Sequence, residues 1–273
     1  MLPTVVKNLL IINGLLFLAT ISLSTLGINL IDILGLHYFA STKFMPHQLV
    51  TYMFMHGGFA HIFFNMFAVW MFGSSIENYW GPKRFLIYYL LTGFGAAALH
   101  YLIFYFEINP DLQLMNAFLE NPSYGSLETL LRHFQITFEP GVSIEWHNAF
   151  NTFRDATIVL DRDPTNTEAL NTAVQFISDY KEYYLNLPVI VGASGSLFGI
   201  LLAFGMMFPN TRLYMIFIPI PIKAKYFVIG YGALELYSAL ENNPGDNVAH
   251  FAHLGCMIFG FILIKFWKAR GTI

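Results

Sequence analysis

The chain has 273 residues, of which 56% are hydrophobic and 11% are charged, and its formal net charge is -3 at pH 7. Soluble domains usually carry about 25% charged residues, so this composition argues against a water-soluble protein and indicates that the lipid bilayer surrounds much of the surface. The slight negative charge argues against a nucleic-acid partner. The single cysteine, Cys256, excludes a disulfide framework or a cysteine-based zinc cluster within one chain.

Six segments are long and apolar enough to span a bilayer as helices, which takes about 20 residues each. They lie near residues 8–28, 50–78, 84–106, 188–208, 222–241 and 248–267. The first is followed by a poor signal-peptide cleavage site, so we interpret it as a retained membrane helix. Pro219 and Pro221 blur the start of the fifth. The predicted fold is all-α: a polytopic membrane protein built as a six-helix bundle.

The segment between the third and fourth predicted spans, residues 107–187, interrupts this apolar pattern. It contains twelve acidic residues and four basic ones (Glu107, Asp111, Glu120, Glu128, Glu139, Glu145, Asp155, Asp161, Asp163, Glu168, Asp179 and Glu182; Arg132, Arg154, Arg162 and Lys181). Helical periodicity appears in 126–135, 146–160 and 166–185. We therefore predict a membrane core at 1–106 with helices 1–3, an acidic helical insert outside the membrane at 107–187, and the rest of the core at 188–273 with helices 4–6.

Basic residues outside the insert indicate how the chain is oriented. Six spans place both termini on one side, together with nine basic residues (Lys7, Lys83, Arg84, Arg212, Lys223, Lys225, Lys265, Lys268 and Arg270). The opposite side has only Lys43. Because Lys and Arg concentrate in cytoplasmic loops, we expect a multi-pass protein of a bacterial inner membrane, with both termini cytoplasmic and the insert facing outward.

Polar residues inside a membrane are costly and are therefore functional candidates; here they form three clusters, at 56–65, 192–199 and 249–256. In the second cluster, Ser194 lies at the start of an apolar helix and is flanked by Gly192 and Gly195. Glycines allow a tight turn and the close approach of a substrate strand, and the free N–H groups of a helix start can hold an oxyanion. The alternative is a small-residue surface for helix packing, and this cluster alone does not decide between the two.

A serine hydroxyl needs a base to become a nucleophile, and the third cluster offers two histidines. His253 can accept the serine proton and return it to a leaving amine, while His250, three residues earlier and on nearly the same helical face, competes for the role. Each could instead bond to a neighbouring helix. No Asp or Glu in that helix can complete a triad, so these residues indicate a Ser-His dyad.

The first cluster supplies hydrogen-bond donors. His61 and Asn65 are four residues apart and share a helical face, so their N–H groups could stabilise the negative oxygen of a tetrahedral intermediate. His56 is expected near the mouth of the helix.

Zinc proteases place a Glu between two histidines four residues apart, and neither histidine pair fits that spacing. We therefore expect no metal and no other cofactor.

Taken together, the three clusters resemble the rhomboid family of intramembrane serine proteases in order and spacing. The motifs are His56, His61 and Asn65; Gly192-Ala193-Ser194-Gly195; and Ala252-His253, with Gly260 seven residues after the histidine. The resemblance covers the chain outside the insert. It implies a serine endopeptidase that cleaves transmembrane segments of single-span or other membrane proteins with a Ser-His dyad.

The resemblance also implies a role for each residue that matches a family motif. Ser194 resembles the nucleophile and His253 the base, because the spacing to Gly260 favours His253 over His250. An oxyanion hole is implied at His61, Asn65 and the Ser194 backbone N–H. The implied supporting residues are His56 near the site mouth, Gly192 and Gly195 beside the nucleophile, Phe198 packed on the catalytic histidine, His250 as a secondary polar group, and Glu77 with Gly81 as a structural pair.

Three features depart from the family pattern. Cys256 replaces the first glycine of a Gly-x-x-x-Gly in the last helix, the loop between the first two helices lacks a Trp-Arg pair, and the acidic insert has no counterpart.

Alternative functions are a catalytically inactive relative that binds membrane proteins and a transporter whose polar residues line a pathway. The sequence indicates neither the natural substrate nor an oligomeric state.

Overall fold

The computed structural model describes residues 2–215, 218–241 and 250–272, and the chain divides into two compact units. We call the first the core unit; it comprises Met1–Phe39, Lys43–Ile103 and Val189–Ile273. We call the second the insert unit; it comprises Ala40–Thr42 and Phe104–Pro188.

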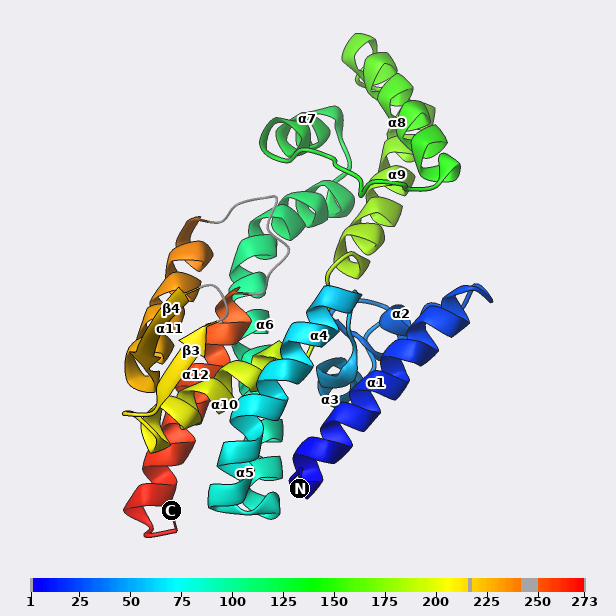
Figure 1. Cartoon of the computed structure of the whole chain (residues 1–273). Helices are drawn as coiled ribbons and strands as arrows, with labels where there is room; N and C mark the ends of the chain where they lie inside the picture. Colours follow the sequence, from blue (N-terminus) through cyan, green and yellow to red (C-terminus); the bar gives the residue numbers. More distant parts are fainter. Residues whose placement is uncertain (1, 216–217, 242–249, 273) are drawn as a thin grey trace. The chain divides into compact units, whose positions relative to one another are not determined.

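Helices dominate the core unit (Figure 1). They are α1 (Thr4–Ser24), α2 (Leu30–Leu34), α3 (Gln48–Thr51), η1 (Tyr52–Phe54), α4 (Phe59–Ala68), the π-helical η2 (Val69–Gly73), α5 (Ser74–Trp80), the first part of α6 (Pro82–Glu120), α10 (Ser194–Met207), α11 (Ala224–Glu241) and α12 (His250–Ala269). Two small antiparallel pairs accompany them: β1 (Leu36–His37) with β2 (Val189–Ile190), and β3 (Arg212–Met215) with β4 (Ile218–Lys223).

Four helical segments among the described residues are long and apolar enough to cross a membrane: Thr4–Ser24, Phe59–Trp80, Pro82–Glu120 and His250–Ala269. The α10 helix is apolar but has only 14 residues, and α11 carries Lys225, Glu235 and Glu241. The predicted class, an all-α polytopic membrane protein, is confirmed. That the chain crosses the membrane six times stays a prediction.

The bounds of the predicted spans and of the observed helices differ, and two spans illustrate this. In the segment 50–78 the long helix begins only at Phe59, because the chain leaves the short helices α3 and η1 and is extended at Met55 and Gly58 before α4. The segment 84–106 is part of one 39-residue helix, α6, which continues through Pro110. Proline removes one backbone donor and usually ends or kinks a helix, but α6 continues past Pro110 to Glu120.

The α10 helix lies at the centre of the core unit, with ten of its residues buried, and it contacts α4, α5, α11 and α12 (Figure 1). Its contact with α6 is polar as well as apolar: Tyr88 donates to the Gly199 carbonyl at 2.8 Å, and Ser196 donates to the Tyr89 carbonyl at 2.7 Å. A Cβ at Gly199 would lie 2.7 Å from the Thr92 side chain, so the small residue permits close packing between α6 and α10.

One buried carboxylate stabilises the start of α1. The N-cap residue of this helix, Pro3, provides no side-chain cap, and Glu77 of α5 accepts hydrogen bonds from the Val5 and Val6 N–H groups at 2.9 and 2.8 Å. These N–H groups have no partner inside the helix, and a carboxylate also interacts favourably with the positive end of the helix dipole. Gly81, with a φ of 82°, then ends α5. This explains the Glu77–Gly81 pair physically.

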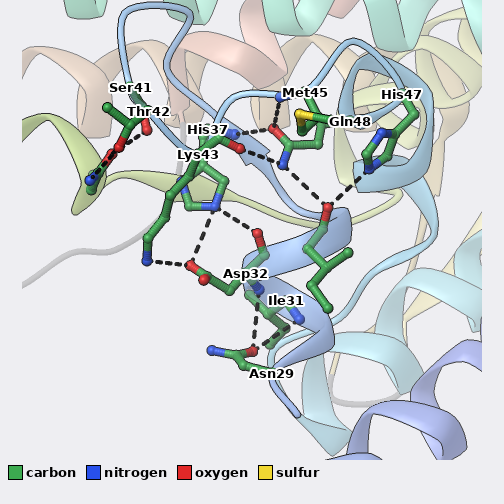
Figure 2. Close-up of polar contacts among 12 residues, drawn as sticks. Asn29, Ile31, Asp32, His37, Ser41, Thr42, Lys43, Met45, His47 and Gln48 are labelled. Atoms are coloured by element: carbon green, nitrogen blue, oxygen red, sulfur yellow. Dashed lines mark hydrogen bonds and ion pairs between the residues drawn. The ribbon is translucent and has the colours of Figure 1, made fainter.

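The segment between α1 and α4 is held by a polar network, which Figure 2 shows. Asn29 caps α2 by accepting from the Ile31 and Asp32 N–H groups. The buried Gln48 amide donates to the Ile33 and Lys43 carbonyls at 3.2 and 3.0 Å, and its oxygen accepts from the His37 and Met45 N–H groups at 3.3 and 3.1 Å (Figure 2). Buried backbone groups need such partners, so Gln48 fixes this loop without the Trp-Arg pair.

The insert unit has a core of its own. It contains the second part of α6 and α7 (Tyr124–His133), α8 (Ile144–Arg162) and α9 (Thr167–Asn186), and α8 packs along α9. Its buried side chains include Phe134, Phe153 and Phe176, with the Phe153 and Phe176 rings stacked at 4.3 Å. Tyr180 accepts from the Thr137 N–H and donates to the Thr137 carbonyl, which ties the extended chain after α7 to α9.

Residues 40–42 belong to this unit although the sequence analysis assigned them to the membrane core. Ser41 donates to the Asn186 side chain, and Thr42 donates to Glu182 at 2.9 Å. These bonds join residues 145 and 140 positions apart in the chain, and such long-range pairs have no signal in local periodicity.

Candidate active site

Ser194 is the first residue of α10, and the backbone turn before it depends on glycine. Gly192 has a φ of 124°, a conformation that other residues rarely adopt. A Cβ on Gly192 would lie 2.7 Å from His61 Nε2 and 3.5 Å from Ser194 Oγ. The predicted nucleophile and the predicted oxyanion donor His61 therefore border the same small space, and Gly192 keeps that space open.

Gly195 has a different reason to be small. A Cβ at this position would lie 2.8 Å from the Ala96 side chain on α6 and 3.4 Å from the Tyr52 hydroxyl. The Tyr52 carbonyl also accepts a hydrogen bond from the Gly192 N–H at 2.9 Å. The chain around Ser194 is thus fixed against η1 and α6, while the Ser194 side chain itself stays partly exposed.

The polar residues of the first cluster lie together at the start of α4. The Asn65 side-chain amide lies 3.1 Å from His56 Nε2, and the His56 and His61 rings are 4.9 Å apart. His56 and Asn65 are buried. If Nε2 of His56 accepts the Asn65 proton, its own proton is on Nδ1. His56 precedes α4 in the chain, so it holds Asn65 from outside the helix.

His253 lies in α12, is buried, and is stacked on Phe198 of α10 at 4.1 Å between ring centroids, with an interplanar angle of 11°. Phe198 is one turn after Ser194 on α10, so this contact sets the imidazole beside the helix that carries the predicted nucleophile. Within the described part of the chain, no hydrogen bond joins Ser194 to His253. A base and its nucleophile are often further apart without substrate and come together in the complex.

The residue that the sequence analysis missed is Glu235 of α11. Its Oε2 atom lies 2.9 Å from His253 Nδ1 and 2.7 Å from His250 Nδ1, and the side chain is buried. The last helix indeed contains no Asp or Glu that can complete a triad, but this carboxylate comes from the neighbouring helix α11. The available signal was an acidic residue within an apolar segment, which is a functional candidate by default.

Glu235, His250 and His253 are also, among the described residues, the group whose donor atoms come close enough to hold a metal ion, all within 4.8 Å of one another. Two histidines and one carboxylate form a donor set that zinc uses. Here both Nδ1 atoms lie within hydrogen-bond distance of the same carboxylate oxygen, so this oxygen can accept from both rings without a cation. We therefore interpret the cluster as a hydrogen-bonded one.

The remaining features of α12 explain the sequence motif around His253. A Cβ at Gly260 would collide with the Tyr88 hydroxyl of α6, so glycine allows the two helices to approach closely. Cys256, which occupies the first position of the Gly-x-x-x-Gly motif, is fully buried and donates to the His253 carbonyl at 2.9 Å. A small side chain is thus accommodated at this position.

Comparison with known proteins gives one family model and two curated relatives. Residues 43–107 and 168–269 match the model of the Rhomboid domain. The chain is similar to the mitochondrial RHOMBOID-like protein 6 of Arabidopsis thaliana, with 40% identity over 52 residues, which are 19% of this chain and 17% of that protein. It is also similar to the Rhomboid protease GluP of Bacillus subtilis (strain 168), with 41% identity over 46 residues, which are 17% of this chain and 9% of that protein.

These two matches cover less than a fifth of each relative's length. No solved structure matches the chain significantly.

Proposed function

Because this chain belongs to the rhomboid family, we propose that it is an intramembrane serine endopeptidase in which Ser194 is the nucleophile and His253 is the base. The observation that carries the proposal is the stacking of His253 on Phe198, one helical turn after Ser194, while His61 borders the Ser194 hydroxyl at Gly192. Three separate elements thereby bring a serine, an imidazole and a donor to the start of α10.

The reaction that these groups support is acyl transfer to serine followed by hydrolysis. Ser194 Oγ forms a bond to the carbonyl carbon of a substrate peptide, and its proton moves to His253 Nε2. The C–N bond then breaks, and His253 gives the proton to the leaving amine. Water next adds to the acyl carbon and loses a proton to His253, which returns it to Ser194 Oγ as the acid product leaves.

The negative oxygen of each tetrahedral intermediate needs donors that are already in place. We assign this role to the Ser194 backbone N–H at the first turn of α10 and to the side chains of His61 and Asn65. His56 is expected to hold Asn65 in position through their 3.1 Å contact. Removing one such donor typically lowers the rate by about 100-fold to 1,000-fold.

The proposed substrates are membrane proteins, including single-span ones, cut within or beside a transmembrane helix. A helix must unwind locally to expose a bond to Ser194, so residues with low helix propensity near the cleavage site should help. Water must reach the site from outside the hydrocarbon region, because backbone and polar groups at membrane depth need protein or water partners. We propose further that the chain lies in a bacterial inner membrane with both termini cytoplasmic.

The test compares cleavage of a labelled single-span substrate by the purified wild type, Ser194→Ala, His253→Ala and His250→Ala in the same detergent. We expect essentially no cleavage by the first two variants and partial activity for His250→Ala. Equal cleavage by all four proteins would contradict the proposal. Binding of the substrate without cleavage by the wild type would instead indicate an inactive relative.

A further inference from the structure

The imidazole of a general base has two nitrogens, and the one that does not face the nucleophile needs a hydrogen-bond acceptor. If Nε2 of His253 is to take the Ser194 proton, its Nδ1 must carry a proton from the start. In this structure that nitrogen lies 2.9 Å from Glu235 Oε2. A buried carboxylate therefore occupies the position from which the tautomer of the base is controlled.

We propose that Glu235 is a positioning residue for His253, which extends the Ser-His pair to a Ser-His-Glu arrangement; this inference rests on the function proposed above. Glu235 accepts the Nδ1–H, which leaves the Nε2 lone pair free for the Ser194 proton. It stays ionised while His253 is protonated, and its negative charge stabilises the imidazolium that forms.

The packing of α11 supports this role. Tyr231 lies one turn before Glu235 on α11, and its ring stacks on Phe198 at 5.1 Å, while Phe198 stacks on His253 at 4.1 Å. The same helical face thus supplies the carboxylate and contacts the aromatic ring on which the imidazole lies. The α10 and α11 helices together therefore set the orientation of the His253 ring and its hydrogen bond to Glu235.

His250 shares the carboxylate with the proposed base. Its Nδ1 lies 2.7 Å from the same Oε2 atom. A carboxylate oxygen has two lone-pair sites and can accept both protons, so His250 holds Glu235 without displacing His253. His250 is therefore expected to adjust the carboxylate, whereas Glu235 acts on the base directly.

A purely structural role must be distinguished, because a buried Glu that joins α11 to α12 could simply stabilise their packing. The decisive comparison is Glu235→Gln, which keeps the size of the side chain and removes its charge. Its matched control is Glu241→Gln, the same substitution on the same helix at an exposed position that contacts Tyr237. Both variants are assayed with a labelled single-span substrate, and the concentration of folded enzyme is measured by active-site titration.

We expect Glu235→Gln to lower kcat by at least about tenfold with KM within about twofold of the wild type, because a transition-state interaction is lost. Glu241→Gln should match the wild type. Glu235→Asp should recover part of the lost kcat, because it restores the charge at a longer distance. A lower melting temperature with unchanged kcat per active site would overturn the proposal and leave Glu235 a structural residue.

A second measurement needs no variant at Glu235. In wild-type protein labelled with ¹⁵N-histidine, nitrogen chemical shifts report which ring nitrogen of His253 carries the proton, and His253→Ala identifies its signals. A proton on Nδ1 supports the proposal, and a neutral ring with its proton on Nε2 alone overturns it. Full activity of Ser194→Ala or His253→Ala would instead reject the underlying assignment of Ser194 and His253 as the catalytic pair, so the two failures are distinguishable.

Discussion

At the scale of single residues, the site depends on contacts between groups that are distant in the chain. His61, Ser194 and His253 come from α4, α10 and α12, and Glu235 comes from α11. Residue types and spacing predicted the first three, because each stands in a recognisable local motif. Glu235 has no such motif, and its pairing with His253 exists only once α11 packs on α12.

The backbone at Gly192 gives a prediction at this scale. Gly192→Ala should lower the cleavage rate by at least about tenfold, because a φ of 124° is strained for alanine and its Cβ would push against His61. The control is Gly14→Ala in α1, where no atom lies within 4 Å of the added Cβ; it should retain wild-type activity. Steady-state cleavage of a labelled substrate measures the activity of both variants. Wild-type activity of Gly192→Ala would contradict the interpretation that the turn before Ser194 requires glycine.

The Glu235 cluster gives a prediction about metal removal. Because both histidines bond directly to the carboxylate, treatment with a chelator such as EDTA should leave the cleavage rate unchanged. A metal on His253 would occupy a nitrogen of the proposed base, so a bound cation should inhibit rather than support the reaction. Loss of activity on chelation, with recovery on adding back zinc, would show that the cluster is a functional metal site.

At the scale of elements, apolar length predicted most helices but not where they begin and end. The start of α4 at Phe59 and the continuation of α6 through Pro110 differ from the predicted spans. Hydropathy reports whether a segment tolerates lipid, whereas helix ends depend on caps and on tertiary contacts. Glu77 shows this, because it caps α1 from a helix more than 70 residues away.

This cap yields a stability prediction. Glu77→Ala should lower the free energy of unfolding by about 1–3 kcal/mol, because two N–H groups at the start of α1 lose their buried acceptor. The exposed Glu128, which pairs with Arg132 on the surface of α7, provides the control variant Glu128→Ala. Thermal unfolding in detergent should show a lower melting temperature for Glu77→Ala only; equal melting temperatures for both variants would contradict the capping role.

At the scale of the whole molecule, the chain is an integral multi-pass membrane protein of the rhomboid family with a second compact unit inserted in it. The insert unit buries its own aromatic core, whereas the sequence of 107–187 predicted only its helices, from their periodicity. The pair Phe153 with Phe176 joins α8 to α9, and such a contact between two helices has no signal in the sequence of either helix alone. We propose that this unit faces the outer side of the membrane and that it screens or captures substrates.

The proposed orientation can be tested with single cysteines, because the native Cys256 is fully buried and should not react. Asn151→Cys on the exposed side of α8 and Thr272→Cys near the C-terminus both place a thiol at an exposed residue. A membrane-impermeant maleimide added to intact cells should label only the first, and permeabilised cells should label both. Labelling of the C-terminal cysteine in intact cells would contradict cytoplasmic termini.

The most direct test of the central claim is covalent labelling of the protein with a fluorophosphonate, followed by mass spectrometry to locate the modified serine. Phosphonylation requires a serine activated by a base. We predict that the wild type is modified at Ser194, that His253→Ala reacts far more slowly, and that the buried Ser196 carries no label. Modification at another serine, or equal labelling of Ser194 with and without His253, would contradict the account.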